Sequence, residues 1–85
     1  MQQYAGFADL IAVDESKNTV FGECKWRNIH TDRDIFLDLV RKSDLFPNFV
    51  KKQYILFSKS PFSSRLISTA ASRHDTVLIG LKEMF

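Results

Sequence analysis

The chain has 85 residues, of which 45% are hydrophobic and 26% are charged, and its net charge is +2 at pH 7. This composition is that of a globular protein with room for one small domain over residues 1–85, and it excludes a disordered tail. No apolar run approaches the roughly 20 residues of a membrane helix, no signal peptide is evident, and a single cysteine excludes an internal disulfide. We therefore expect a cytoplasmic protein without a membrane segment.

The first elements expected along the chain are two strands. Residues 7–13 (FADLIAV) are apolar except for Asp9, and residues 19–26 (TVFGECKW) are rich in β-branched and aromatic side chains. A polar segment of turn-forming residues, 14–18, separates the two runs. The pattern predicts an antiparallel hairpin.

Helices and strands are expected to alternate after the hairpin. Apolar residues at helical spacing predict a helix over residues 32–43, capped by Thr31, and a second helix that begins at Ser60 and Pro61. The apolar runs 54–57 and 76–79 predict two buried strands, the first of them covered on both faces. The order strand, strand, helix, strand, helix, strand predicts an α/β fold with a mixed sheet flanked by helices.

Three charged residues interrupt the strands of the hairpin. Glu23 and Lys25 are two positions apart and therefore lie on one face of their strand, with Cys24 on the other. A turn in the middle of the polar segment would bring Asp9 opposite them, and an even-sum register would place all three on the same face. The pattern predicts that two carboxylates and one ammonium group converge at one end of the hairpin.

Such a cluster has two interpretations. Two carboxylates are the hard oxygen ligands that Mg²⁺ prefers, and a metal held there would polarise a phosphodiester and activate a bound water. A lysine beside that water would orient it or take its proton, and would stabilise the charge that develops on the phosphoryl group. Alternatively, the three side chains form an ion-pair cluster that fixes the register of the strands.

The segments around these residues resemble a known family. Residues 7–28, FADLIAVDESKNTVFGECKWRN, are similar to the PD-(D/E)XK nuclease-like domain at the C-terminus of archaeal-type AAA-class ATPases. In that family a strand with an acidic residue leads through a turn into F-G-E-C-K-W. Residues 52–62, KQYILFSKSPF, resemble the family's later apolar strand and its F-S-K-S-x-F segment.

The resemblance implies a restriction-endonuclease-like fold and metal-dependent hydrolysis of nucleic acid, DNA rather than RNA. It assigns Asp9 and Glu23 as the metal-binding acids and Lys25 as the catalytic lysine. It also implies the backbone carbonyl of Cys24 as a further ligand, Mg²⁺ or Mn²⁺ as cofactor, and an ATPase module as partner. The chain itself has no Gly-rich phosphate loop or Walker motif, so we do not expect it to hydrolyse ATP.

One departure from the family bears on the expected assembly. Relatives usually carry a helix before the first strand, whereas only residues 1–6 precede the strand here. We expect this helix to be missing and one apolar sheet face to be uncovered, which predicts a homodimer that covers the face. The alternative function is a catalytically inactive module that binds nucleic acid, or that mediates oligomerisation or regulation of an ATPase.

The remaining candidate residues are expected to have structural roles. Cys24 is expected to be a buried thiol, Trp26 to pack against a helix, and His30 and His74 to lie at the surface. Solvated charge is expected for Arg27, Lys51, Lys52 and Lys59. Ser58 and Ser60 also stand where a phosphate could meet a helix start.

Overall fold

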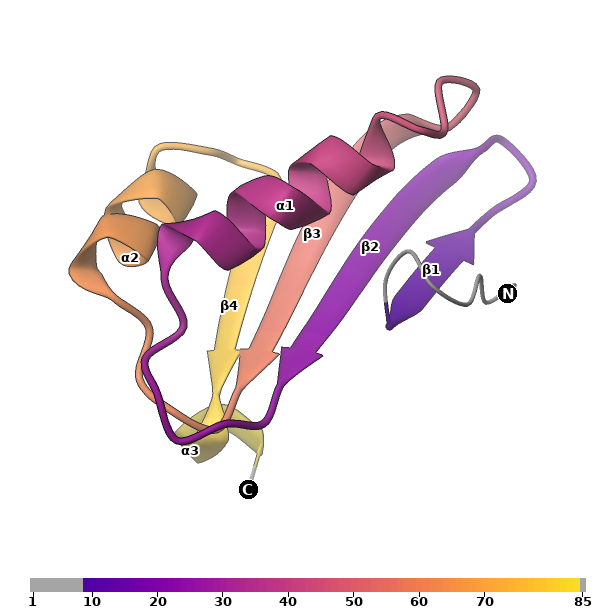
Figure 1. Cartoon of the computed structure of the whole chain (residues 1–85). Helices are drawn as coiled ribbons and strands as arrows, with labels where there is room; N and C mark the ends of the chain where they lie inside the picture. The colour runs from indigo at the N-terminus through magenta and orange to yellow at the C-terminus, as the bar shows by residue number, and fades with distance from the viewer. Residues whose placement is uncertain (1–8, 85) are drawn as a thin grey trace.

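The structure, a computed structural model, describes residues 9–84 and shows a four-stranded mixed sheet with helices packed on it (Figure 1). The elements in chain order are β1 (Leu10–Val13), β2 (Asn18–Lys25), α1 (Arg33–Ser43), β3 (Val50–Ser58), α2 (Ser64–Ala71), β4 (Thr76–Gly80) and α3 (Leu81–Met84). The predicted α/β fold and its order of elements are confirmed. The short α3 follows β4 and was not predicted.

β1 and β2 form the predicted hairpin. They pair antiparallel, with Leu10 opposite Gly22 and Ile11 opposite Phe21, which is the even-sum register that the charge pattern requires. A Cβ atom on residue 22 would lie only 3.3 Å from the Cβ of Leu10. The glycine of the FGECKW segment therefore leaves room for the Leu10 side chain to lie across β2.

The other three strands run in the same direction. β2 pairs parallel with β3, and β3 with β4, so α1 and α2 are the crossover connections. The carboxyl ends of these strands consequently share one edge of the sheet, and the connections to both helices leave from it (Figure 1). The two strand-to-helix connections touch there through a bridge between Thr31 and Phe62.

Both helices are capped at residues other than those predicted. The cap of α1 is Asp32 rather than Thr31, and the cap of α2 is Ser63 rather than Ser60. The hydroxyl of Thr31 cannot serve as a cap because it makes a buried hydrogen bond of 2.7 Å with the hydroxyl of Ser58. Oδ1 of Asp32 also accepts the Ser63 hydroxyl at 2.6 Å, so one carboxylate ties the two helix starts together.

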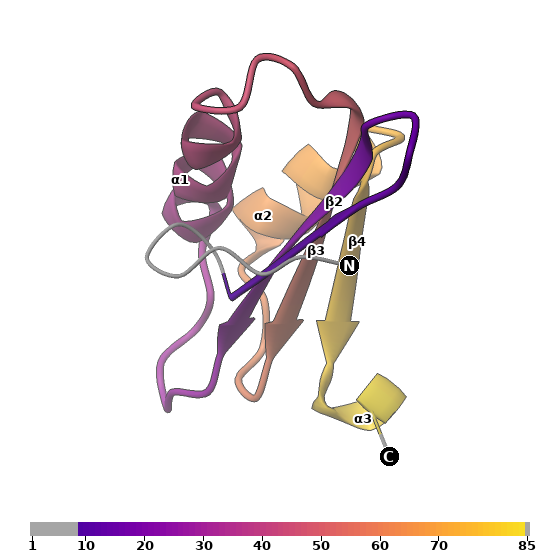
Figure 2. The same cartoon turned by 90° about the vertical axis from the view of Figure 1, so that its right-hand side faces the viewer.

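α1 and α2 cover the same side of the sheet (Figure 2). The side chains buried beneath them form the hydrophobic core: Ile11, Phe21, Phe36, Leu39, Tyr54, Leu56 and Leu66. The ring of Tyr54 stacks on Phe21, with 6.0 Å between centroids, and meets Phe36 edge to face at 5.8 Å. Aromatic contacts therefore join the two central strands to the first helix.

The opposite side of the sheet is covered by neither α1 nor α2 (Figure 2). We call it the bare face and define it by the paired strand residues that alternate with the core positions, apart from Asn18, which lies before the register shift between β2 and β3: Leu10, Ala12, Val20, Gly22, Cys24, Gln53, Ile55, Phe57, Val77 and Ile79. The prediction that β3 is covered on both faces was wrong. Tyr54 and Leu56 are buried, but Ile55 and Phe57 are only partly buried because they point away from the helices.

Two further expectations concern the N-terminus and the membrane. The expected absence of a helix before the first strand falls on residues ahead of Asp9 and lies outside the described residues, as do the first two residues of the predicted strand 7–13. Over residues 9–84, no helix combines the length and the apolar character needed to cross a membrane.

Candidate functional site

Asp9, Glu23 and Lys25 lie together at the carboxyl end of β2. The register of the hairpin places Asp9 across from Glu23, and the two carboxyl groups are close enough to share a hydrogen bond. Nζ of Lys25 is 3.7 Å from Oε1 of Glu23. The three charged side chains therefore gather at one end of the hairpin, as the alternation of the strands predicts.

Glu23 is the buried member of this group. Its residue is 7% exposed, and it lies on the helix-covered side of β2 together with Phe21. Burial raises the pKa of the Glu23 carboxyl above its ordinary 4.5, and the negative charge of Asp9 raises it further, while Lys25 opposes the rise. Holding this carboxylate ionised costs free energy, and a cation placed beside the two acids would offset that cost.

Lys42 is a member of the group that sequence reasoning missed. Its charge acts on Glu23 in the same direction as Lys25, and its Nζ lies 3.2 Å from Oδ2 of Asp38, one helical turn away. The four-residue spacing of Asp38 and Lys42 indicates a shared helix face. That this face borders Glu23 depends on how α1 lies over β2, which is a tertiary property.

Asp9 is exposed and is held by the backbone of the neighbouring strand. Its Oδ2 accepts the N–H of Cys24 at 2.7 Å. Because the N–H and C=O of one strand residue leave the same edge of the strand, the Cys24 carbonyl also points toward the Asp9 side of β2. The Asp9 and Glu23 carboxylates and this carbonyl therefore border the same corner of the sheet.

This donor set fits one class of metal ion. Within the part of the chain that the structure describes, no three His, Cys, Asp or Glu side chains are grouped so as to hold a metal. A fully protein-ligated zinc site is therefore not formed by these residues. Two carboxylates and a carbonyl leave about half of an octahedral shell to water and substrate, which suits Mg²⁺ or Mn²⁺.

Two expectations about neighbouring residues were wrong. Cys24 is exposed rather than buried, because the alternation that turns it away from Glu23 directs it onto the bare face. Trp26 is 54% exposed and so is not packed beneath a helix. His30 and His74 are exposed, as predicted.

The polar residues at the end of β3 and just after it form hydrogen bonds within the protein. The hydroxyl of Ser58, a buried residue, donates to the carbonyl of Ser60 at 2.8 Å, and the hydroxyl of Ser60 donates to the carbonyl of Arg27. Nζ of Lys59 donates to Oδ1 of Asn28 at 2.9 Å. These bonds hold the two strand-to-helix connections together and give both serines a structural role.

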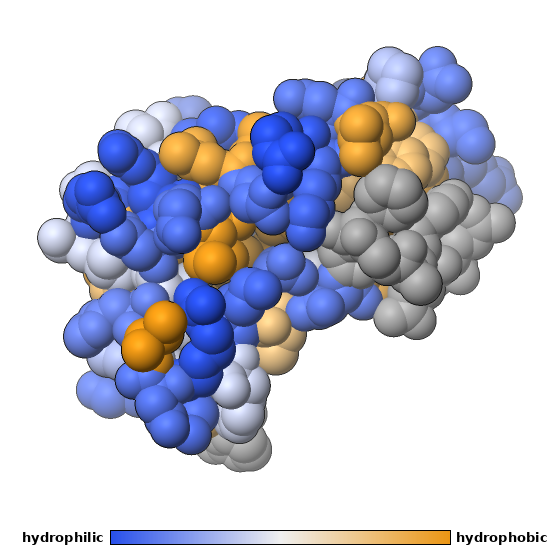
Figure 3. Space-filling model, viewed as in Figure 1, coloured by the Kyte–Doolittle hydropathy of each residue, from blue (hydrophilic) through white to orange (hydrophobic). Residues whose placement is uncertain are grey.

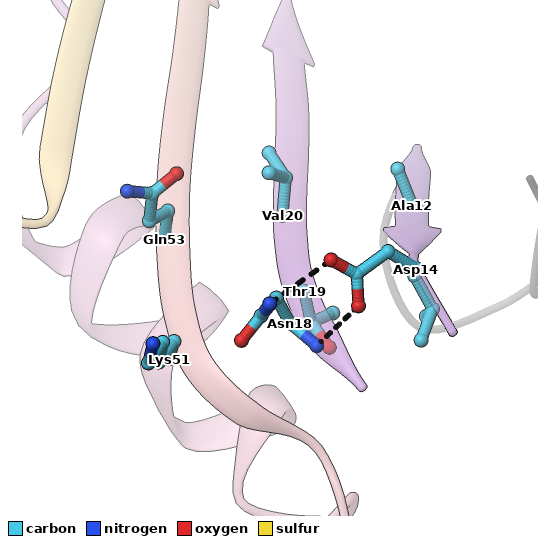
Figure 4. Close-up of a pocket in the computed structure, with 8 residues that line it drawn as sticks. Ala12, Asp14, Asn18, Thr19, Val20, Lys51 and Gln53 are labelled. Carbon is cyan, nitrogen blue, oxygen red and sulfur yellow. Dashed lines mark hydrogen bonds between the residues drawn. The ribbon is translucent and has the colours of Figure 1, made fainter. Parts of the chain in front are cut away.

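A pocket of about 560 Å³ lies at the opposite end of the hairpin (Figure 4). There Asp14 accepts the backbone N–H and the side-chain Nδ2 of Asn18, each at 2.9 Å. The side-chain bond from Asn18 is the main cause that lowers the pKa of Asp14. Figure 4 shows Asp14 turned toward Asn18, with Lys51 on the far side of β2. We assign this acid to the closure of the hairpin turn, because its oxygens are already hydrogen-bonded.

Comparisons with protein-family models, with curated proteins and with solved structures found no match for the chain. The family resemblance seen in the sequence therefore stays a prediction, and the site is interpreted from its own geometry.

Proposed function

We propose that the chain is a PD-(D/E)XK nuclease-like domain with a restriction-endonuclease-like fold, which hydrolyses phosphodiester bonds in DNA with Mg²⁺ or Mn²⁺ and works beside an ATPase module. The observation that carries the proposal is Glu23. This carboxylate is 7% exposed, adjoins a second carboxylate on Asp9, and has one lysine at 3.7 Å. Two adjacent acids repel each other, so an ion-pair cluster that only fixed strand register would be more stable with one of them.

Each residue has a defined part in this function. Asp9, Glu23 and the carbonyl of Cys24 would hold the metal, which when bound would polarise the phosphodiester and lower the pKa of a water molecule. Lys25 follows Glu23 by two positions on the same face. Its amino group would hold the attacking water and balance the negative charge that develops on the phosphoryl oxygens.

Cleavage of supercoiled plasmid, single-stranded DNA and RNA in Mg²⁺ or Mn²⁺ tests the proposal. We expect metal-dependent cleavage of DNA that falls at least ~100-fold in Asp9→Ala and in Lys25→Ala. Lys51→Ala is the matched control, since it removes an exposed lysine from the other end of the sheet and should leave cleavage unchanged. Cleavage that survives both site substitutions would come from another source and would contradict the assignment.

A second candidate is a module that binds nucleic acid, or regulates an ATPase, without cleaving. One observation favours it: the Asp9 carboxylate accepts the Cys24 N–H, and Lys25 pairs with Glu23, so these side chains have partners without a metal. Retention of labelled DNA by the wild-type protein, with no product in either metal, would favour this candidate over the nuclease.

A further inference from the structure

We propose that the bare face is the interface of a two-fold homodimer in which two copies of the chain pack sheet against sheet. The inference rests on the chemistry and shape of that face and is independent of the proposed nuclease activity.

The bare face lacks the charge of an ordinary protein surface. None of its ten positions carries a charged side chain, although 26% of the chain is charged and about 3 of ten would be expected. Asp14, Asn18 and Lys51 form a polar end of this face, where they line the pocket together with Ala12, Val20 and Gln53. Val77 is 52% exposed and Cys24 is exposed as well. An uncharged apolar face of this kind marks a contact surface.

The helix-bearing side of the molecule differs from the bare face. Its surface is mainly hydrophilic, with separate hydrophobic patches (Figure 3). Scattered apolar side chains of that kind are normal on a protein surface. Among the described residues, the uncharged positions of the bare face are contiguous along paired strands, whereas the apolar side chains of the helix-bearing side are scattered.

The absence of charge favours a second copy over a different partner. A two-fold axis brings a patch against itself, so any charge near the axis would meet its own like, and none of the ten strand positions carries one, since Asp14 and Lys51 lie at one end of the face. A partner recognised by charge would find its complementary groups at that end and not among the ten strand positions. Two sheets pack face to face about 10 Å apart with their strands about 30° from parallel, a geometry that open strand faces such as this one permit.

The small size of the face indicates a weak interface. Four strands spaced ~4.8 Å apart and about five residues long cover roughly 19 by 17 Å, a footprint of roughly 300 Å² on each copy. Two copies would therefore cover about 600 Å², to which the relief of the side chains adds, and this is below the ~1,200 Å² of stable specific interfaces and in the range of weak, transient ones. We therefore expect a dissociation constant on the order of 10 µM.

Sedimentation equilibrium from about 1 to about 200 µM protein tests the dimer. Val77→Lys puts a charge on the bare face, and Ile67→Lys is its matched control on α2, because both side chains are 52% exposed. We expect wild type and Ile67→Lys to dimerise alike and Val77→Lys to bind at least ~10-fold more weakly, since a buried unpaired charge is costly. A wild-type protein that stays monomeric throughout, or an equal loss in Ile67→Lys, would overturn the proposal and leave the face to another partner.

The exposed thiol provides a second measurement that does not depend on how well the Val77 variant folds. Cys24 lies on the bare face at the end of β2, so its alkylation by a maleimide should slow as the wild-type concentration rises through the dimerisation range. A rate that is independent of protein concentration would contradict the interface even if the protein self-associates elsewhere.

Discussion

The two faces of this sheet differ in their charged side chains: charge lies on the covered face, and the ten positions of the uncovered face have none. An ordinary protein has the reverse arrangement. The helix-covered face carries the charges Glu23 and Lys25, and the former is 7% exposed. The bare face has no charged side chain among its ten positions although neither α1 nor α2 covers it (Figure 2). A buried charge and an exposed apolar patch are the two observations about burial that carry information. The comparison is the basis of the two proposals above, a cation beside the buried acid on one side and a second copy on the other.

The largest expected difference between the faces is in stability. Leu56 is fully buried and its neighbour Phe57 lies on the bare face. We expect Leu56→Ala to lower the free energy of unfolding by about 2–5 kcal/mol through loss of packing and a residual cavity. Phe57→Ala should cost about 1 kcal/mol when the protein is dilute, because its side chain keeps contact with water. Urea unfolding at about 1 µM protein measures both, and equal losses would show that the bare face is covered within one copy.

Substitution of the buried acid Glu23 is expected to change stability less, and to raise it. Glu23→Gln removes a carboxyl whose pKa is raised by burial, so we expect the variant to be more stable than wild type at neutral pH without metal, by about 1 kcal/mol or ~4–8 °C in Tm. Thermal unfolding across pH measures this difference. Cys24→Ser is the control, because the thiol is exposed and its loss should leave Tm of the dilute protein unchanged.

The pH dependence of the Glu23→Gln difference has a definite sign. Between the ordinary pKa of 4.5 and the raised value, the folded protein binds more protons than the unfolded one, so wild-type stability falls as pH rises through this window. The amide of the variant does not titrate. The advantage of the variant should therefore be small below pH 4.5, grow as pH rises, and level off above the raised pKa. An advantage that shrank with rising pH would mean that Glu23 is stabilised as a carboxylate.

Much of the fold follows from the sequence because it depends on local patterns. Apolar alternation and turn residues were enough to predict the hairpin and the even sum of its register, and helical spacing was enough for α1. The features of the fold that the sequence did not predict depend on long-range contacts. Thr31 and Asp32 can both cap a helix, but Asp32 caps α1 because the Thr31 hydroxyl is hydrogen-bonded to Ser58, 27 residues away. Likewise, the apolar run in β3 gives no sign that helices cover only one of its faces.

The candidate site likewise has residues that the sequence predicts and residues that it does not. Strand parity and the turn position were sufficient to group Asp9, Glu23 and Lys25, since the hairpin is a local structure. Lys42 comes from α1 and approaches Glu23 only because that helix packs over β2. The exposure of Cys24 was mispredicted because it depends on what covers the sheet, which parity does not reveal.

Calorimetric titration of the protein with Mn²⁺ tests the central claim, that Asp9 and Glu23 are kept together for a divalent cation. We predict one Mn²⁺ bound per chain by wild type, binding at least ~10-fold weaker in Glu23→Gln, and unchanged binding in Cys24→Ser, whose backbone carbonyl is retained. A wild-type protein that binds no Mn²⁺, or a Glu23→Gln variant that binds it equally well, would contradict the account.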